Sequence, residues 1–448
     1  MVITNFKNLA KNSLRKKALL IAEAGYEAID ITKTVSQKIK FQNNKLSICS
    51  AMTCHSVGLD NYKNVFLIGI GKGSALACAS LAKILDKKLT KGITLDIQRP
   101  KLEIRNLKLE ILTGTHPLPS KQNVGATQKI VKLAKNLKKD DLLINFICGG
   151  GSALACGSQK ELKDLILVTK LLTKSGANIL ELNTVRKHLS EIKGGGLAKI
   201  AYPATVVSLI VSDVIGNDLS MVASGPTVFD KTTKKDAEKV LSKYFNIRTS
   251  DVLRTSDVQR LIHVLKETPK NKKYFKKVKN VLFVCNQDAV LAMNKRAKKL
   301  GFKPKIYSLV VKGEARHALL PMLNKIKVGE ALLAAGETTV TLDNRPVGKG
   351  GRNMEAVLGT LTKLIQNSEF RIQNYALLSV ASDGRDNTEA AGAIGDFFAL
   401  EKAKKLKLEP EEFLDQNNSF DFFKKTGDLI FAKSKSFNVS DLMIILRQ

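Results

Sequence analysis

Glycine-rich turns that carry a polar or charged residue follow several apolar runs of the sequence. The first is "LIGIGKGSA", in which Gly71 and Lys72 come directly after an apolar run. Glycines let backbone N–H groups approach an anion closely, and the start of a following helix adds a partial positive charge. Such turns therefore predict an anion-binding crevice. The others are "CGGGSAL" (148–154), "SDVIGNDLSMVASGPT" (212–227), "GETTV" (336–340) with "GKGGRN" (348–353), and "ASDGRDNTEAAGA" (381–393).

The first turn matches neither common nucleotide-binding motif. A dinucleotide fingerprint has the spacing G-x-G-x-x-G and an acidic residue about 20 positions later. Gly69, Gly71 and Gly73 instead give G-x-G-x-G, and Asp96 stands only loosely at the acidic position. A Walker loop is absent. The distinctive residue is thus Lys72, which either binds an anion or is a solvated lysine on a tight turn.

The segment "LNTVRKHLSEIKGGGLA" (182–198) adds two further cations. At helical spacing, Asn183, Arg186, Ser190 and Lys193 form one polar stripe. We expect Asn183, Arg186 and Lys193 to bind the substrate. A solvated helix face is the alternative.

Carboxylates gather at the same predicted strand ends, namely Asp213, Asp218, Glu337, Asp383 and Asp386. Cations and carboxylates in one crevice suit phosphoryl transfer, because carboxylates hold a metal or accept a hydroxyl proton while Lys or Arg neutralises phosphate charge. The alternative is that each carboxylate only caps a helix or a turn.

We assign roles to these candidates on that basis. Lys72, Arg352, Asp213 and Asp383 are the expected catalytic residues, and Asp213 and Asp218 are the expected Mg²⁺ ligands. The expected ATP-binding residues are Gly71, Gly149, Gly150, Gly151, Ser152 and Glu337.

The elements that must position these residues alternate between short apolar runs and amphipathic segments. Apolar runs at 65–70, 92–97, 141–147 and 204–214 predict buried strands, separated by helical patterns such as residues 74–85 and 161–174. Runs of this kind are typical of a parallel sheet covered on both faces. The fold class is therefore α/β with a doubly wound, Rossmann-like parallel sheet, whose ligands bind at the carboxyl ends of the strands.

Length and composition indicate two domains. A chain of 448 residues exceeds one ordinary core. Residues up to about 45 are expected to be largely helical, and the lysine-rich stretch 230–280 is the expected linker region, itself partly helical. A second series of alternating strands and helices is expected to begin with "VLFVCN" (281–286). We therefore predict an N-terminal domain over 1–275 and a smaller C-terminal α/β domain over 276–448.

Hydropathy, cysteine content and net charge also limit the class of protein. No apolar run reaches the roughly 18 residues of a membrane helix, and the N-terminus lacks the features of a signal peptide, so a cytoplasmic protein without membrane contact is expected. The six cysteines contain no CxxC pair and are expected to be reduced thiols. The net charge of +32 comes from scattered lysines. It favours anionic substrates and predicts no specific nucleic-acid partner, because basic and aromatic residues do not alternate.

Taken together, the motifs resemble the glycerate 2-kinases of the MOFRL type. The similar segments also include "HPLP" (116–119) and "NVSDLMI" (438–444), and they follow the family's order along nearly the whole chain. The resemblance implies two α/β domains with the active site in the cleft between them. It also implies ATP-dependent conversion of D-glycerate to 2-phosphoglycerate with Mg²⁺, and functional roles for Lys72 and Arg352.

Four segments depart from the family pattern. Ser120 stands where the family usually has Asp, and Asn217 interrupts its "GDD" segment. The acidic loop 382–393 is shortened, and "AKSKSFNVSD" (432–441) replaces a glycine-rich approach. The last two changes bear on substrate choice. An NAD(P)H-dependent hydroxypyruvate-type reductase and a basic nucleic-acid-binding protein are the alternative functions, and a homodimer stays open.

Overall fold

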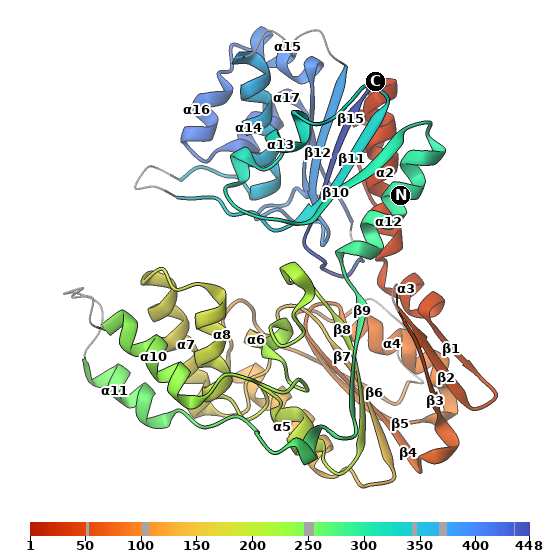
Figure 1. Ribbon diagram of the computed structural model, residues 1–448, viewed down its shortest axis with the longest axis vertical. Helices are drawn as coiled ribbons and strands as arrows, with labels where there is room; N and C mark the ends of the chain where they lie inside the picture. The colour runs from red at the N-terminus through yellow and green to blue at the C-terminus, as the bar shows by residue number, and fades with distance from the viewer. Residues whose placement is uncertain (51–52, 101–106, 246–254, 343–346, 367–373, 434) are drawn as a thin grey trace. The chain divides into compact units, whose positions relative to one another are not determined.

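The computed structural model describes residues 1–448 except 51–52, 101–106, 246–254, 343–346, 367–373 and 434. The chain forms two compact units. The central unit is Val35–Phe283, and the terminal unit combines Met1–Thr34 with Val284–Gln448. Each unit contains its own six-stranded sheet (Figure 1).

The central unit is built on the sheet β6-β5-β4-β7-β8-β9. Neighbouring strands from β6 to β8 run parallel. All seven residues of β7 are buried, as an apolar strand covered on both faces requires. The strands are β4 (Asn64–Ile70), β5 (Leu89–Asp96), β6 (Leu109–Thr113), β7 (Asp141–Ile147), β8 (Thr205–Val211) and β9 (Val278–Val284).

The order of these strands defines where a ligand binds. From β4 the chain builds outward through β5 to β6, and then returns to the other side of β4 with β7 and β8. The direction of building therefore reverses between β4 and β7. In an open parallel sheet the loops at such a reversal separate and leave a crevice at the carboxyl ends of the strands.

Helices cover both faces of the central sheet. Helix α4 contacts β4, β5 and β7 on one face, while α5 and α9 pack together with strand side chains in a separate apolar cluster. The helices are α4 (Ser74–Leu85), α5 (Lys121–Lys135), α6 (Gly151–Leu154), α7 (Gln159–Lys174), α8 (Ile179–Leu189) and α9 (Gly196–Ala201), followed by α10 (Lys234–Phe245) and α11 (Thr255–Val264).

Three local predictions for this unit are wrong. Residues 39–58, part of which was expected to be helical, form the antiparallel sheet β1 (Ile39–Gln42), β2 (Lys45–Cys49) and β3 (Cys54–Gly58). The expected linker instead supplies α10 and α11, which share an apolar core with α7 and α8; residues 246–254 lie outside the described residues. The run "VLFV" is the end of β9, a strand of the central sheet rather than the start of a second one.

The terminal unit has a mixed sheet in the order β10-β11-β15-β12-β13-β14. Strand β15 runs antiparallel between β11 and β12, so its first residue, Asp441, pairs with the last residues of both, Gly336 and Ala381. The strands are β10 (Lys303–Val311), β11 (Glu330–Gly336), β12 (Tyr375–Ala381), β13 (Gly392–Asp396), β14 (Leu429–Ile430) and β15 (Asp441–Arg447).

The helices of the terminal unit lie on the two faces of this sheet (Figure 1). Helices α2 and α12 pack against each other and against the central strands, and α14 packs against β12 and β13. The helices are α1 (Phe6–Leu9), α2 (Ser13–Ala28), α12 (Asn286–Lys299), α13 (Leu320–Leu323), α14 (Arg352–Gln366), α15 (Phe397–Lys405), α16 (Pro410–Asp415) and α17 (Ser419–Thr426), while α3 (Ile31–Lys38) spans the boundary of the two units.

A buried ion-pair network fixes the N-terminal helices to the terminal unit. The Arg15 guanidinium is fully buried and donates both Nε and Nη2 to Asp396, each at 2.6 Å, and Nη1 to Asp428 at 2.7 Å. Burial opposes the charge, but Asp396 and Asp428 more than compensate and raise the pKa of Arg15. The structural units therefore differ from the predicted boundaries, because a contiguous division at 275/276 cannot assign residues 1–34 to the C-terminal part.

The prediction that the cysteines are all reduced is also wrong. Cys49 and Cys54 are cross-strand partners of β2 and β3 and form a disulfide. The remaining cysteines, Cys78, Cys148, Cys156 and Cys285, are free and buried. Within the described part of the chain, no helix has both the length and the apolar character needed to cross a membrane.

Replacing Arg15 should destabilise the protein strongly. Arg15→Ala leaves two buried carboxylates without their cation, which typically costs about 3–5 kcal/mol. Urea unfolding measures this loss, and Lys16→Ala, at the neighbouring exposed residue, is the matched control. Equal stability of the two variants would contradict the structural role of the network.

Candidate functional site

In the central unit, Lys72 and the glycine loop meet at the reversal between β4 and β7. The Lys72 backbone N–H donates to the Gly149 carbonyl at 2.9 Å. Gly71 has φ +113°, and a Cβ there would overlap the Cys148 carbonyl, so only glycine fits. The predicted residues Gly71, Lys72 and Gly149 therefore lie together.

Asp96 has a structural role that explains the incomplete dinucleotide motif. Its Oδ2 accepts the Ala75 N–H at the start of α4 at 3.0 Å, and its Oδ1 accepts the Ile97 N–H. Burial raises the pKa of Asp96, although these backbone hydrogen bonds oppose the shift. The helix start that would hold a pyrophosphate in a Rossmann site is thus occupied by a carboxylate of the chain.

The loops after β7 and β8 are packed closely. A Cβ on Gly149 would overlap the Asp213 carboxylate, and one on Gly151 would lie 2.5 Å from Ala223 Cβ. Ala223 and Ser224 have φ values of +51° and +59°, a backbone region that costs a non-glycine residue energy. This packing places Asp213 directly beside the glycine loop, as predicted.

A chain of hydrogen bonds connects the loop with α8. The hydroxyls of Ser152 and Ser224 lie 2.8 Å apart, and Ser224 Oγ donates to Asn183 Oδ1 at 3.0 Å. Asn183 and Ser224 are buried, whereas Ser152 is partly exposed. Asn183 therefore supports Ser152 through Ser224 rather than lying open to a substrate.

Arg186 and Lys72 are cations without acidic partners. Among the described residues, no carboxylate forms an ion pair with either, and Arg186 Nη2 donates to Thr169 Oγ1 at 3.0 Å. Burial lowers the pKa of Arg186 to about 10. Burial and the charges of Lys72 and Arg186 lower the pKa of His116. Lys72 follows β4 with only Gly71 between them, so it places a cation without a described acidic partner at the carboxyl end of that strand, as an anion-binding site requires.

Lys193 does not fit its predicted role as a substrate ligand. It is fully buried, and its ammonium donates to the Ala155 carbonyl at 2.5 Å, to Glu161 Oε1 at 3.1 Å and to Ser190 Oγ at 3.3 Å. Ala155 follows α6 directly, so Lys193 anchors the end of the glycine loop. Its three hydrogens are already used within the protein.

The predicted residues of the terminal unit gather around Arg352, the first residue of α14. Its Nε and Nη2 donate to the two oxygens of Asp441 at 2.6 and 3.2 Å, and its Nη1 donates to Glu337 Oε1 at 2.6 Å. Burial opposes the charge, but Asp441 and Glu337 together raise the pKa of Arg352. The guanidinium is thereby held in one orientation, with part of its surface exposed.

Two further carboxylates belong to the same sheet edge. Asp386 Oδ2 accepts the Met354 N–H near the start of α14, while Asn353 Nδ2 donates to both Asp386 and Asp441. Asp383 lies in the turn after β12 and accepts the Arg385 N–H at 3.1 Å. Asp386 is thus a helix cap, and Asp383 is the more accessible of the two.

Asp441, the buried partner of Arg352, is absent from the candidate residues predicted from the sequence. Its carboxylate is buried, which raises its pKa to about 7 despite the opposing effect of Arg352. The motif "NVSD", which resembles the family pattern, ends with this residue. Only the antiparallel placement of β15, however, brings residue 441 to the ends of β11 and β12.

The two expected metal ligands differ in position. Asp213 adjoins Gly149, whereas Asp218 lies on an exposed loop and accepts the Ser220 N–H at 2.9 Å. In the described part of the chain, no three His, Cys, Asp or Glu side chains form a metal-binding group.

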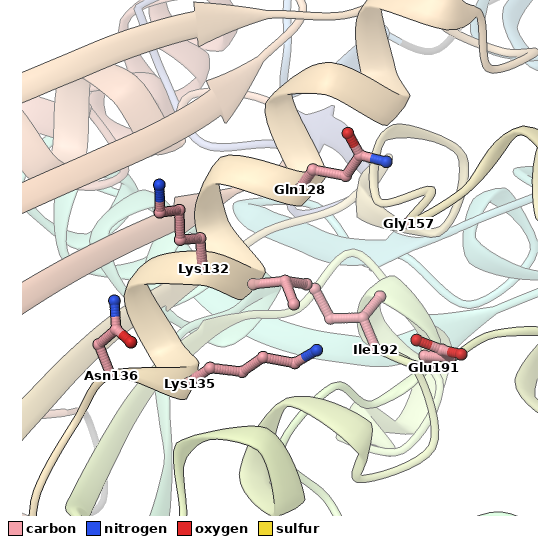
Figure 2. Close-up of a pocket in the computed structure, with 8 residues that line it drawn as sticks. Gln128, Lys132, Lys135, Asn136, Gly157, Glu191 and Ile192 are labelled. Atoms are coloured by element: carbon pink, nitrogen blue, oxygen red, sulfur yellow. The ribbon is translucent and has the colours of Figure 1, made fainter.

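A surface pocket of the central unit lies elsewhere. It is lined by the exposed face of α5 and by the segments at Gly157 and Glu191, and none of our candidate residues contributes to it (Figure 2). The candidate site is therefore defined by the strand ends and not by this pocket.

The fold is that of a two-unit α/β protein whose strand ends carry the cations, carboxylates and glycines described above. Two family models match the chain: "Domain of unknown function (DUF4147)" over residues 17–256 and "MOFRL family" over residues 330–441. The chain therefore belongs to the MOFRL-type glycerate kinase family, as its relatives of similar length also show.

Relatives along nearly the whole chain agree with this assignment. The D-glycerate 2-kinase of Thermotoga maritima is 32% identical over 447 residues, covering 96% of this chain and 98% of the relative. A protein of Agrobacterium vitis named "Putative hydroxypyruvate reductase" is 34% identical over 398 residues, covering 85% and 86%. The crystal structure of glycerate kinase from Thermotoga maritima has 31% identity and a TM-score of 0.79, covering 97% of this chain and 100% of that one.

Gly149→Ala should disturb the site more than a glycine replacement elsewhere. The new methyl group must displace Asp213, and overpacking of this kind typically costs about 1–3 kcal/mol. Gly125→Ala on α5 is the matched control, because a Cβ there meets no atom within 4 Å and helix propensity predicts a gain of roughly 0.5–1 kcal/mol. Thermal unfolding of both variants measures the difference; similar shifts would argue against close packing at Gly149.

The raised pKa of Asp441 predicts a pH-dependent stability. Because its pKa in the folded state is about 7, above the usual value near 4, its contribution is complete below about pH 4 and is lost as the pH rises through 7. Relative to Asp441→Asn, the wild-type free energy of unfolding should therefore fall between pH 5 and pH 8. Urea titrations at both pH values test this, and a constant or rising difference would contradict the shift.

Proposed function

We propose that this protein is a glycerate 2-kinase that transfers the γ-phosphoryl group of ATP to the 2-hydroxyl of D-glycerate. The observation that carries the proposal is Lys72, which lies against the glycine loop and forms no ion pair with a carboxylate of the described residues. Arg186 of α8 is a second cation without such a pair in the same unit. This arrangement suits a substrate with a negatively charged group, and the kinase relatives support phosphoryl transfer.

The reaction requires two things of the protein. The hydroxyl oxygen attacks the γ-phosphorus as the bond to the ADP oxygen breaks, so charge on the phosphoryl oxygens must be neutralised. The proton of the hydroxyl must also pass to a base. We assign the first task to Lys72 and Arg352, and the second to Asp213 or Asp383.

The glycine loop is the proposed site of the ATP phosphates. Gly149, Gly150, Gly151 and Ser152 leave room for close approach, and the Asn183–Ser224–Ser152 hydrogen bonds hold the loop in place. Mg²⁺, when bound with ATP, would neutralise part of the charge of the phosphates. Asp213 is its proposed protein ligand, and the exposed Asp218 is the second candidate.

Glu337 is assigned differently from the sequence prediction. It pairs with Arg352, so its proposed task is to orient that guanidinium rather than to contact the nucleotide. Asp441 shares this task from the buried side.

A reductase remains the second candidate, because some relatives carry the hydroxypyruvate reductase name. The cap formed by Asp96 on α4 argues against a dinucleotide at this turn. Oxidation of NADH with hydroxypyruvate as substrate, at a rate above that of ATP-dependent phosphorylation of D-glycerate, would favour the reductase.

Lys72→Ala tests the proposed function. Loss of one charge that neutralises the phosphoryl group should reduce turnover by at least about 100-fold, without lowering the melting temperature. The measurement is D-glycerate-dependent formation of ADP. Lys83→Ala, at an exposed position on α4, is the control with full activity expected. Full turnover by the Lys72 variant would overturn its catalytic assignment.

A further inference from the structure

We propose that His116 is a substrate-binding residue whose imidazole N–H donates a hydrogen bond to the oxyanion held by Lys72. The proposal deepens the proposed function, on which it rests for the identity of the substrates. It concerns a residue outside the candidate list, at the loop that follows β6.

The position of His116 is the first argument. A Cβ on Gly150 would lie 3.3 Å from His116 Cδ2, 3.4 Å from its Nε2 and 3.2 Å from Lys72 Cγ. The loops after β4, β6 and β7 thus bring a lysine, a histidine and a glycine backbone to one point. The imidazole is exposed and has no hydrogen-bond partner within the described part of the chain.

The backbone that carries His116 is rigidly held, which is the second argument. Buried Asn123 accepts hydrogen bonds from the Thr115 N–H at 2.9 Å and from the Ser120 N–H at 3.0 Å. Its Nδ2 donates to the carbonyls of Thr115 and Leu154, at 3.0 and 3.2 Å. Leu154 is the last residue of α6, so one side chain ties the His116 loop to the glycine loop.

Charge is the third argument. Partial burial and the positive charges of Lys72 and Arg186 lower the pKa of His116, which disfavours a further positive charge on its imidazole. A neutral imidazole has one N–H donor. It can therefore complete the coordination of an oxyanion without adding a third charge. Both the carboxylate of glycerate and a phosphate of ATP have the required chemistry.

Steady-state kinetics distinguish whether His116 binds the carboxylate of glycerate or a phosphate of ATP. His116→Ala should raise the KM for one substrate at least tenfold while kcat changes less, and His116→Gln should retain part of the affinity through its amide N–H. A raised KM for D-glycerate identifies the carboxylate, and a raised KM for ATP identifies the phosphate. His317→Gln, at an exposed histidine of the terminal unit, is the matched control and should leave both constants unchanged.

Binding measured by NMR keeps the test independent of turnover. The chain has five histidines, so the imidazole nitrogen signals of His116 can be assigned by their loss in His116→Gln. We expect these signals to shift with D-glycerate or with a non-hydrolysable ATP analogue, while the His317 signals stay constant.

The outcomes distinguish the two proposals. If the wild-type protein does not phosphorylate D-glycerate but His116 shifts with the ATP analogue or with inorganic phosphate, the proposed function fails and the oxyanion contact stands. If no ligand shifts the His116 signals and His116→Ala leaves both KM values unchanged at an unaltered melting temperature, the contact is overturned.

Discussion

The desolvation of Arg186 without a carboxylate partner is the constraint on which the account of the central unit depends. Burial lowers the pKa of this guanidinium to about 10, because its charge is removed from water without an acidic side chain beside it. A folded protein retains such a group at a cost. An oxyanion bound beside this guanidinium would offset that cost, in line with the proposed function.

The surrounding structure positions this charge and keeps it unpaired. The reversal of strand order between β4 and β7 brings the glycine loop beside Lys72. Two acidic groups of this unit have structural partners, since Glu161 pairs with the buried Lys193 and Asp96 caps α4. Asp213, by contrast, adjoins the glycine loop.

Arg352 in the terminal unit has the opposite environment. Asp441 and Glu337 neutralise it, and Asn353 and Asp386 fix the start of its helix. An arginine held in this way is preorganised, so it can stabilise charge that develops on an oxyanion without changing its own orientation. The central unit therefore contains cations that have no acidic partner among the described residues. The terminal unit instead holds one guanidinium in a fixed orientation between two carboxylates.

Much of this could be predicted from the sequence, and the exceptions have physical causes. The apolar runs that became β4, β7 and β8 were identified because strands buried on both faces are continuously apolar. The structural role of Lys193 could not be predicted, because helical spacing places the side chain on a polar stripe but does not reveal its ion pair with Glu161. Asp441 and Arg15 depend on contacts with residues at least 88 positions away, which no local pattern reveals.

The measurement that tests the central claim most directly is phosphorus NMR of the products formed from ATP, Mg²⁺ and D-glycerate. The account predicts that the signals of ADP and 2-phosphoglycerate appear together in equal amounts. Unchanged ATP, or ADP accompanied only by inorganic phosphate, would contradict it.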